Sequence, residues 1–84
     1  MTKYTVVWLN SALNELAKLW STTADWNAIA AAANAIDAQL AVDAPSKGTE
    51  LSEGLRALTI PPLRVLFSVR EEDRLVEVAL VKAV

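Results

Sequence analysis

The sequence predicts an α+β fold in which a leading strand is followed by a two-helix hairpin and three antiparallel strands. The helices are expected to pack on one face of the sheet. Three observations support this prediction. The chain opens on a run of β-branched and aromatic residues, apolar residues then recur at steps of three and four, and the C-terminal part alternates between apolar and polar residues. Short connections between the final strands favour antiparallel neighbours.

Length and composition limit what the chain can do. Its 84 residues leave room for one hydrophobic core, so we expect a single domain over residues 1–84. The sequence has no cysteine and no histidine, which excludes disulfides, thiolate zinc sites and nucleophiles activated by histidine. It also has no glycine-rich phosphate loop and no carboxylate pair at a recognisable spacing. We therefore expect neither a metal nor a cofactor.

Charge and hydropathy indicate the compartment and the partners. The net charge is −2, so general electrostatic attraction to nucleic acid is absent and any such contact needs a local basic patch. No segment reaches the ~18 consecutive apolar residues that span a bilayer, and no signal peptide precedes the first strand. We expect a cytoplasmic protein without membrane contact. The cations that could form a patch lie in the C-terminal half: Arg56, Arg64, Arg70, Arg74 and Lys82.

The first predicted strand covers residues 3–9, KYTVVWL. Its alternation places Tyr4, Val6 and Trp8 on one face and Thr5, Val7 and Leu9 on the other. Both faces are largely apolar, which predicts a strand that is covered on both sides or lies near a partner.

Two helices are predicted next. Asn10 and Ser11 are suitable N-cap residues for the first, which ends near residues 21–23. Thr22 and Asp25 match a capping box that opens a second helix running to about Ala41. The apolar stripe of this second helix is expected to lie in the core and consists of Trp26, Ile29, Ala33, Ile36 and Leu40.

Two tryptophans flank the junction of the helices. Trp20 and Trp26 are expected to be ordinary core aromatics, and the alternative is that they anchor a symmetric contact between two copies of the chain.

Residues 43–54 hold both glycines and a proline, so we predict a loop, with Pro45 ending the second helix. Strands follow over residues 55–60, 63–70 and 74–82. The hairpin between the last two carries Glu71, Glu72 and Asp73, with which Arg70 and Arg74 are expected to pair. Glu77 is interpreted as a solvated strand residue, with a role as a general base as the alternative.

The order of these elements resembles the RelE/ParE superfamily of bacterial toxins. The opening YTVVWLNSALNELAKLW, with its hydrophobic strand leading into a helix, is similar to the first half of these proteins. The segment GLRALTIPPLRVLFSVREEDRLVEVALVKAV resembles their second half, with an arginine before a core strand, a charged hairpin and a valine-rich last strand.

The resemblance implies candidate site residues. RelE-type members cut messenger RNA in the ribosomal A site through cations that stabilise charge on the attacked phosphate. On that basis Arg64 and Arg56 are the candidate catalytic residues, because they match the arginine of the core strand and the first basic residue of the preceding strand. The second basic position of that strand is Leu58 here, and the usual C-terminal tyrosine has no counterpart, since Tyr4 is the chain's only tyrosine.

The resemblance also implies a function. It predicts the toxin of a type II toxin–antitoxin module, neutralised by a small antitoxin protein. Its target would be the ribosome and its messenger RNA, or DNA gyrase, and the depleted cations favour binding over cutting. The alternative is a non-toxic family member that serves as an interaction or dimerisation module.

Overall fold

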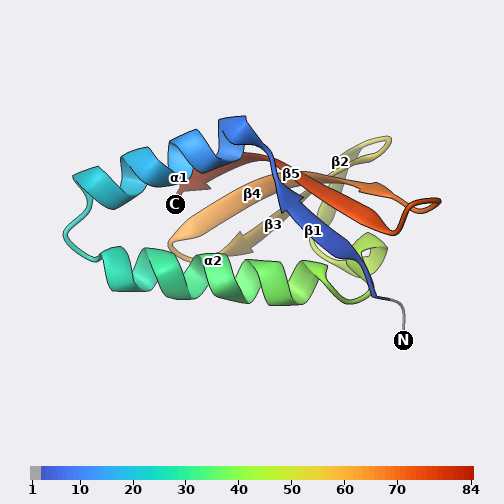
Figure 1. Ribbon diagram of the computed structural model, residues 1–84, viewed down its shortest axis with the longest axis horizontal. Helices are drawn as coiled ribbons and strands as arrows, with labels where there is room; N and C mark the ends of the chain where they lie inside the picture. Colours follow the sequence, from blue (N-terminus) through green and yellow to red (C-terminus); the bar gives the residue numbers. More distant parts are fainter. Residues whose placement is uncertain (1–2) are drawn as a thin grey trace.

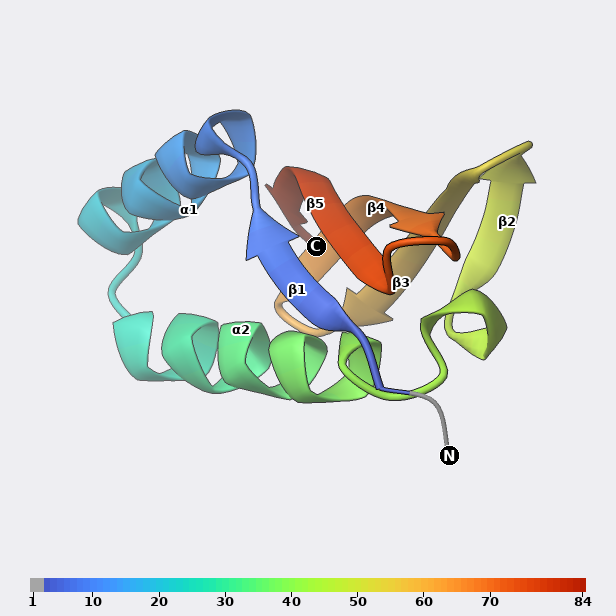
Figure 2. The same ribbon diagram turned by 45° about the vertical axis from the view of Figure 1, so that its right-hand side comes forward.

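The protein has a five-stranded mixed sheet with two helices packed on one of its faces, as Figures 1 and 2 show. The structure is a computed structural model and describes residues 3–84. The elements in chain order are β1 (Thr5–Trp8), α1 (Asn10–Thr22), α2 (Trp26–Leu40), a 3-10 turn (Ala44–Ser46), β2 (Thr49–Ser52), β3 (Leu55–Ile60), β4 (Leu63–Arg70) and β5 (Leu75–Ala83). The predicted α+β fold is confirmed.

The strand order is β1-β5-β4-β3-β2, so the first strand lies beside the last. β1 pairs with β5 in parallel, whereas the other three pairs of neighbours are antiparallel. The whole chain from α1 to β4 forms the long connection that this parallel pair requires. β1 and β2 are the two edges of the sheet.

The core lies between the helices and the sheet face that they cover. α1 runs along β5, and α2 lies over β3 and β4. From α2 come Ile29, Ala32, Ile36 and Leu40, which repeat at steps of three and four and are all buried. The sheet contributes alternate residues of β4 and β5, namely Leu63, Val65, Phe67, Val76, Val78 and Val81, which are fully buried.

A β-bulge at Ala79 keeps the buried residues of β5 on the helix side along the whole strand. Leu66 pairs with Leu80 and Phe67 pairs with Val78, so Ala79 is the extra residue on β5. Its carbonyl oxygen accepts a hydrogen bond of 2.7 Å from the Ser11 hydroxyl. Ser11 therefore ties the start of α1 to β5. The prediction that Asn10 or Ser11 caps this helix is wrong, because the N-cap position is Leu9.

The junction of the helices differs from the predicted capping box. The carboxylate of Asp25 caps α2 and accepts a hydrogen bond of 3.2 Å from the Ala28 N–H. Thr22, in contrast, is the last residue of α1, and its hydroxyl donates to the Lys18 carbonyl. The predicted capping box is therefore wrong, because Asp25 is itself the N-cap and α2 begins at Trp26, later than a cap at Thr22 would start it.

The predicted loop over residues 43–54 is wrong in part, because it contains the 3-10 turn and the strand β2. All four residues of β2 are exposed, so no hydrophobic alternation marks it in the sequence. Gly48 precedes this strand with a φ of 67°, and a Cβ at this position would collide with the backbone of Ala57 on β3. This close approach of backbones, which only glycine permits, brings β2 to the edge of the sheet. Pro45 lies inside the 3-10 turn and does not end α2, which stops at Leu40.

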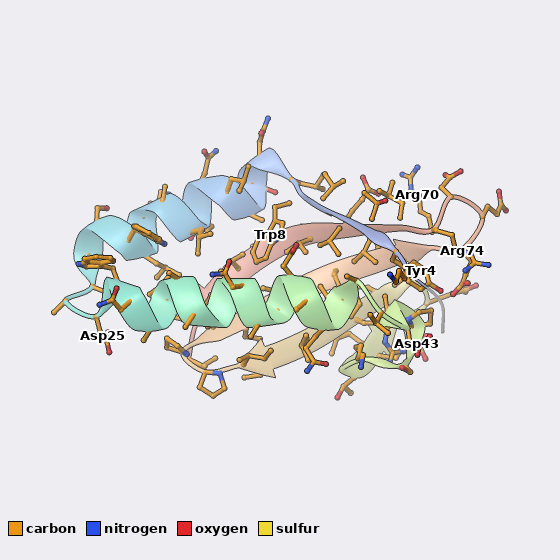
Figure 3. All side chains as sticks on the ribbon, turned by 60° about the horizontal axis from the view of Figure 1, so that its bottom comes forward. Tyr4, Trp8, Asp25, Asp43, Arg70 and Arg74 are labelled. Atoms are coloured by element: carbon orange, nitrogen blue, oxygen red, sulfur yellow. The ribbon has the colours of Figure 1, made fainter. Side chains whose placement is uncertain are left out.

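Only one face of β1 is covered, so the expectation of a strand covered on both sides is wrong, and the alternative of a strand near a partner stays a prediction. Tyr4 is buried and Val6 and Trp8 pack partly against the core, whereas Val7 on the opposite face is 40% exposed. The Trp8 indole N–H reaches across to α2 and donates to the Asp37 carboxylate over 3.2 Å, and Figure 3 shows Trp8 between the two helices.

We expect two valines of neighbouring strands to contribute differently to the free energy of unfolding, because one is buried and the other is exposed. Val78→Ala removes two methyl groups from a fully buried site and should lower the free energy of unfolding by about 2–3 kcal/mol. Val7→Ala makes the same chemical change at a 40% exposed site on the sheet face away from the helices and should cost less than about 1 kcal/mol. Urea denaturation followed by tryptophan fluorescence measures both. Equal losses would contradict the placement of the core.

Candidate functional site

The sheet face away from the helices, here called the open face, carries Arg64. On β4 the residues Leu63, Val65 and Phe67 are buried against the helices, so the alternate residues Arg64 and Leu66 project the other way. Arg64 is paired across the ladder with Lys82 of β5, and Leu66 is paired with Leu80. A row of two cations therefore lies next to a row of two leucines.

A shallow hollow of about 150 Å³ forms where these rows meet β2. Its lining consists of Leu51, Arg64, Leu66, Leu80 and Lys82. Leu51 reaches it from the edge strand that the sequence did not predict. The hollow combines an apolar floor with two cationic groups, so it suits a ligand that has both an apolar and an anionic part.

Arg56, the second candidate, lies on the other face. It is paired with Phe67 in the β3–β4 ladder, and Phe67 is fully buried on the helix side. The Arg56 guanidinium donates hydrogen bonds to the backbone carbonyls of Lys47, at 2.8 Å, and Gly48, at 3.2 Å. These bonds attach β3 to the segment that leads into β2. The structure therefore does not bring Arg56 and Arg64 together.

Leu58 follows the same alternation. It is paired with Val65 on the helix side and packs against the core. A cation at position 58 would project on the helix side and would not face Arg64. The leucine found there therefore removes no charge from the open face.

Tyr4 is distant in the sheet from the hollow and is held in its protonated form. Its hydroxyl donates to the Glu71 carboxylate, at 3.1 and 3.2 Å from the two oxygens, and the Arg74 guanidinium lies 6.0 Å from the ring centre. Figure 3 shows Tyr4 and Arg74 side by side at the start of β1. Burial raises the pKa of Tyr4 above its ordinary value of about 10, and the hydrogen bond with Glu71 raises this pKa further.

The hairpin charges are arranged differently from the expectation. Arg70 forms its ion pair with Glu77 across the β4–β5 ladder, with 3.1 Å between the Nε and Oε1 atoms. Arg74 contacts the Tyr4 ring. The prediction of pairing within the hairpin is therefore wrong for Arg70, and Glu77, whose side chain is only 22% exposed, is not a solvated carboxylate.

Trp20 and Trp26 stack on each other at the tip of the helical hairpin, with 5.8 Å between ring centres. They are 44% and 50% exposed, so the expectation of core aromatics is wrong. Trp20 also borders a hollow on α1 that is lined by Leu13, Leu16 and Ala17. This end of the molecule presents a second apolar surface, separate from the open face.

Two further findings concern the described part of the chain. Residues 3–84 hold no cluster of acidic side chains that could bind a metal ion. Within the same residues, no helix combines the length and the apolar character needed to cross a bilayer.

Sequence reasoning found Arg64 but missed its closest companions. Lys82 was recognised only as one of five cations in the C-terminal half, because its position opposite Arg64 depends on the bulge at Ala79. Leu51 gave no signal, since it lies in a short polar stretch that reads as a loop.

The sequence profile of the ParE toxin of type II toxin–antitoxin systems, parDE, matches residues 6–83. The chain belongs to this ParE toxin family, so it is the toxin component of a type II module.

Among solved structures, the fold is similar to a chain of the toxin–antitoxin complex RelBE2 from Mycobacterium tuberculosis. The TM-score is 0.83 at 22% sequence identity, and the match covers 100% of this chain and 94% of that one. A comparison with curated protein sequences finds no match.

The chain's single tyrosine makes its titration directly measurable. The absorbance of tyrosinate should appear at a midpoint above pH 10 in the folded protein, and Glu71→Gln should move this midpoint down. Because the folded-state pKa is raised, the stabilisation from Tyr4 is complete below about pH 10 and is lost as the pH rises through the folded pKa. Tyr4→Phe should remove this alkaline loss of stability. A midpoint at or below the unfolded value would contradict the buried contact with Glu71.

Proposed function

We propose that this toxin acts by binding DNA gyrase in the cytoplasm, that it does not cut messenger RNA, and that a small antitoxin protein neutralises it. The observation that carries the proposal is the separation of Arg56 and Arg64 on opposite faces of the sheet. Membership in the ParE family supports the gyrase target and the antitoxin.

Cleavage of RNA at the 2′-hydroxyl needs a group that removes a proton and cations that stabilise the phosphate. The hollow beside Arg64 is lined by two cations and three leucines and contains no carboxylate or tyrosine. Tyr4 is protonated and bound to Glu71, and Glu77 is paired with Arg70. The residues described around Arg64 can therefore bind an anion, but they hold no evident general base.

Binding requires much less of the site. An exposed surface with an apolar floor and two cations can contact a protein target without any reacting group. A toxin that blocks an enzyme by occupying it would keep its effect with the residues that this chain has.

Induced expression distinguishes binding to gyrase from cleavage. We expect growth arrest with a DNA-damage response and no codon-phased ends in primer extension on cellular mRNA. The purified protein should inhibit supercoiling by gyrase. Co-expression of the small protein encoded beside this chain should restore growth.

Lys18→Gln serves as the control, because it removes an exposed cation from α1 that already pairs with Glu15. It should leave the arrest unchanged. Codon-phased cuts would contradict the proposed target, and normal growth without the antitoxin would show a non-toxic family member.

A second function, as a dimerisation module, is favoured by the exposed Trp20–Trp26 stack. If the stack forms a symmetric contact, light scattering of the purified protein should give a dimer, and Trp26→Ala should give a monomer because the anchor is lost. Leu13→Ala, which trims an exposed residue of the neighbouring hollow, provides a comparison. A monomer in the unaltered protein would exclude this function.

A further inference from the structure

The two edges of the sheet differ in how they are protected against pairing with another chain. β2 carries the charged residue Glu50, and a register shift between Glu50 and Ser52 interrupts its ladder with β3. β1, in contrast, has the sequence TVVW and holds no charge, no proline and no bulge. Charges, prolines and bulges are devices by which edge strands avoid such pairing. The β1 edge lacks all three, and Figure 2 shows no strand beyond it.

The backbone of β1 leaves polar groups free along this edge. The N–H groups of Thr5 and Leu9 donate to backbone carbonyls of the neighbouring β5 segment, at 2.8 and 2.9 Å. Backbone groups alternate in direction along a strand, so those of Val6 and Trp8 point away from β5. The Tyr4 N–H also points outwards, and it is already bonded to the residue that follows α2. Within residues 3–84, β5 is the only strand that pairs with β1, so the outward groups of Val6 and Trp8 have no strand beside them.

We propose that two copies of this chain pair β1 against β1 in antiparallel orientation, about a two-fold axis at Val7. In this register Val6 of each copy exchanges backbone hydrogen bonds with Trp8 of the other. Val7, which is 40% exposed on the open face, then lies directly opposite Val7 of the second copy. A single contact thus covers an exposed valine and satisfies the free backbone groups of both edges.

The sequence of β1 suits a second copy of itself. Residues 5–9 hold no charge, so the paired strands bring no like charges together and offer no charge that would select a charged partner. Lys3 is the nearest cation. In the antiparallel pair the two copies of Lys3 lie at opposite ends, roughly 27 Å apart along the strands. This separation exceeds the Debye length of about 8 Å at physiological ionic strength, so their repulsion is screened.

The pairing joins two sheets into one continuous sheet. The two-fold axis of an edge-to-edge antiparallel pair runs perpendicular to the sheet, so the helices of both copies lie on one side and both open faces lie on the other. The hollow beside Arg64 is then present twice on the same side of the dimer. The contact uses residues 5–9 and is separate from the Trp20–Trp26 stack.

A single cysteine tests this register, because the chain contains no cysteine of its own. In the proposed dimer the two Cα atoms at position 7 lie roughly 4.5 Å apart, within the range that a disulfide spans. Val7→Cys should therefore form a covalent dimer under mild oxidation, which non-reducing gel electrophoresis measures.

Thr5→Cys is the matched control, since Thr5 is an exposed residue on the same face of the same strand. Its two copies would lie roughly 14 Å apart, which is too far for a disulfide. The covalent dimer should therefore be lost when the cysteine moves from position 7 to position 5.

Hydrogen exchange of the unaltered protein gives an independent measurement. Because β1 spans only four residues, we expect an equilibrium between monomer and dimer. Amide exchange at Val6 and Trp8 should then slow as the protein concentration rises, since their N–H groups become bonded in the dimer. Val7→Lys places like charges directly opposite each other and should abolish this concentration dependence. Thr49→Lys adds the same charge to β2, the other edge, and should preserve it.

Three results would overturn the pairing of β1. Equal cross-linking of Val7→Cys and Thr5→Cys would indicate random collision. Exchange at Val6 and Trp8 that does not depend on concentration would show that the edge stays free. Slower exchange that appears only after addition of the small protein encoded beside this chain would show that the edge takes a strand of another protein.

Two comparisons separate this inference from the proposed functions. The Val7→Cys cross-link should persist when Trp26→Ala is added, and its loss would assign the dimer to the tryptophan stack and overturn the pairing of β1. The inference does not rest on the gyrase target. A chain that fails to inhibit gyrase but forms the cross-link at position 7 would contradict the proposed target and support the pairing of β1.

Discussion

The alternation of side chains along β4 is the constraint on which the rest of the structure depends. Leu63, Val65 and Phe67 are fully buried against the helices, so every residue between them must project from the open face. A slip of one residue would expose these three side chains and bury Arg64, which makes the register strongly specified. The bulge at Ala79 lets β5 follow this pattern, and the Ser11 hydroxyl satisfies the carbonyl that the bulge leaves free.

The same constraint decides the chemistry of the two candidate arginines. Arg56 and Arg64 belong to neighbouring antiparallel strands. Arg56 is paired with Phe67, which faces the helices, so Arg56 projects on the helix side. Arg64 alternates with the buried residues of β4 and therefore projects from the open face into solvent. Arg56 then stabilises structure, since its guanidinium holds the carbonyls of Lys47 and Gly48 and thereby fixes the approach to β2. Through β2 it also supports Leu51, which borders the hollow beside Arg64. Arg64 thus lines the hollow, and Arg56 helps to hold β2, at the edge of that hollow, in place.

Most of the exposed large apolar side chains lie in two regions that differ in composition. The open face combines leucines with the cations Arg64 and Lys82. At the hairpin tip, among the described residues, the Trp20–Trp26 stack makes no contact with a cation. Polar side-chain contacts also hold β1 at the edge of the sheet. Tyr4 joins β1 to the β4–β5 hairpin through Glu71, and Trp8 joins it to α2 through Asp37. A short edge strand thus gains its fixed position from side chains at both of its ends.

The sequence alone determined the elements whose side chains repeat regularly. The period of two in residues 63–70 and the steps of three and four in α2 report burial directly, so α1, β4 and β5 were predicted close to their observed bounds, whereas α2 was predicted to start before Trp26. Only the tertiary structure decided features that depend on a distant segment. The exposed strand β2 exists because Gly48 and Arg56 hold it to β3. Lys82 lies opposite Arg64 because of the bulge in β5. Trp20 and Trp26 stack in solvent because the helical hairpin extends past the end of the sheet. These arrangements follow from backbone register and packing between elements, which local residue patterns do not encode.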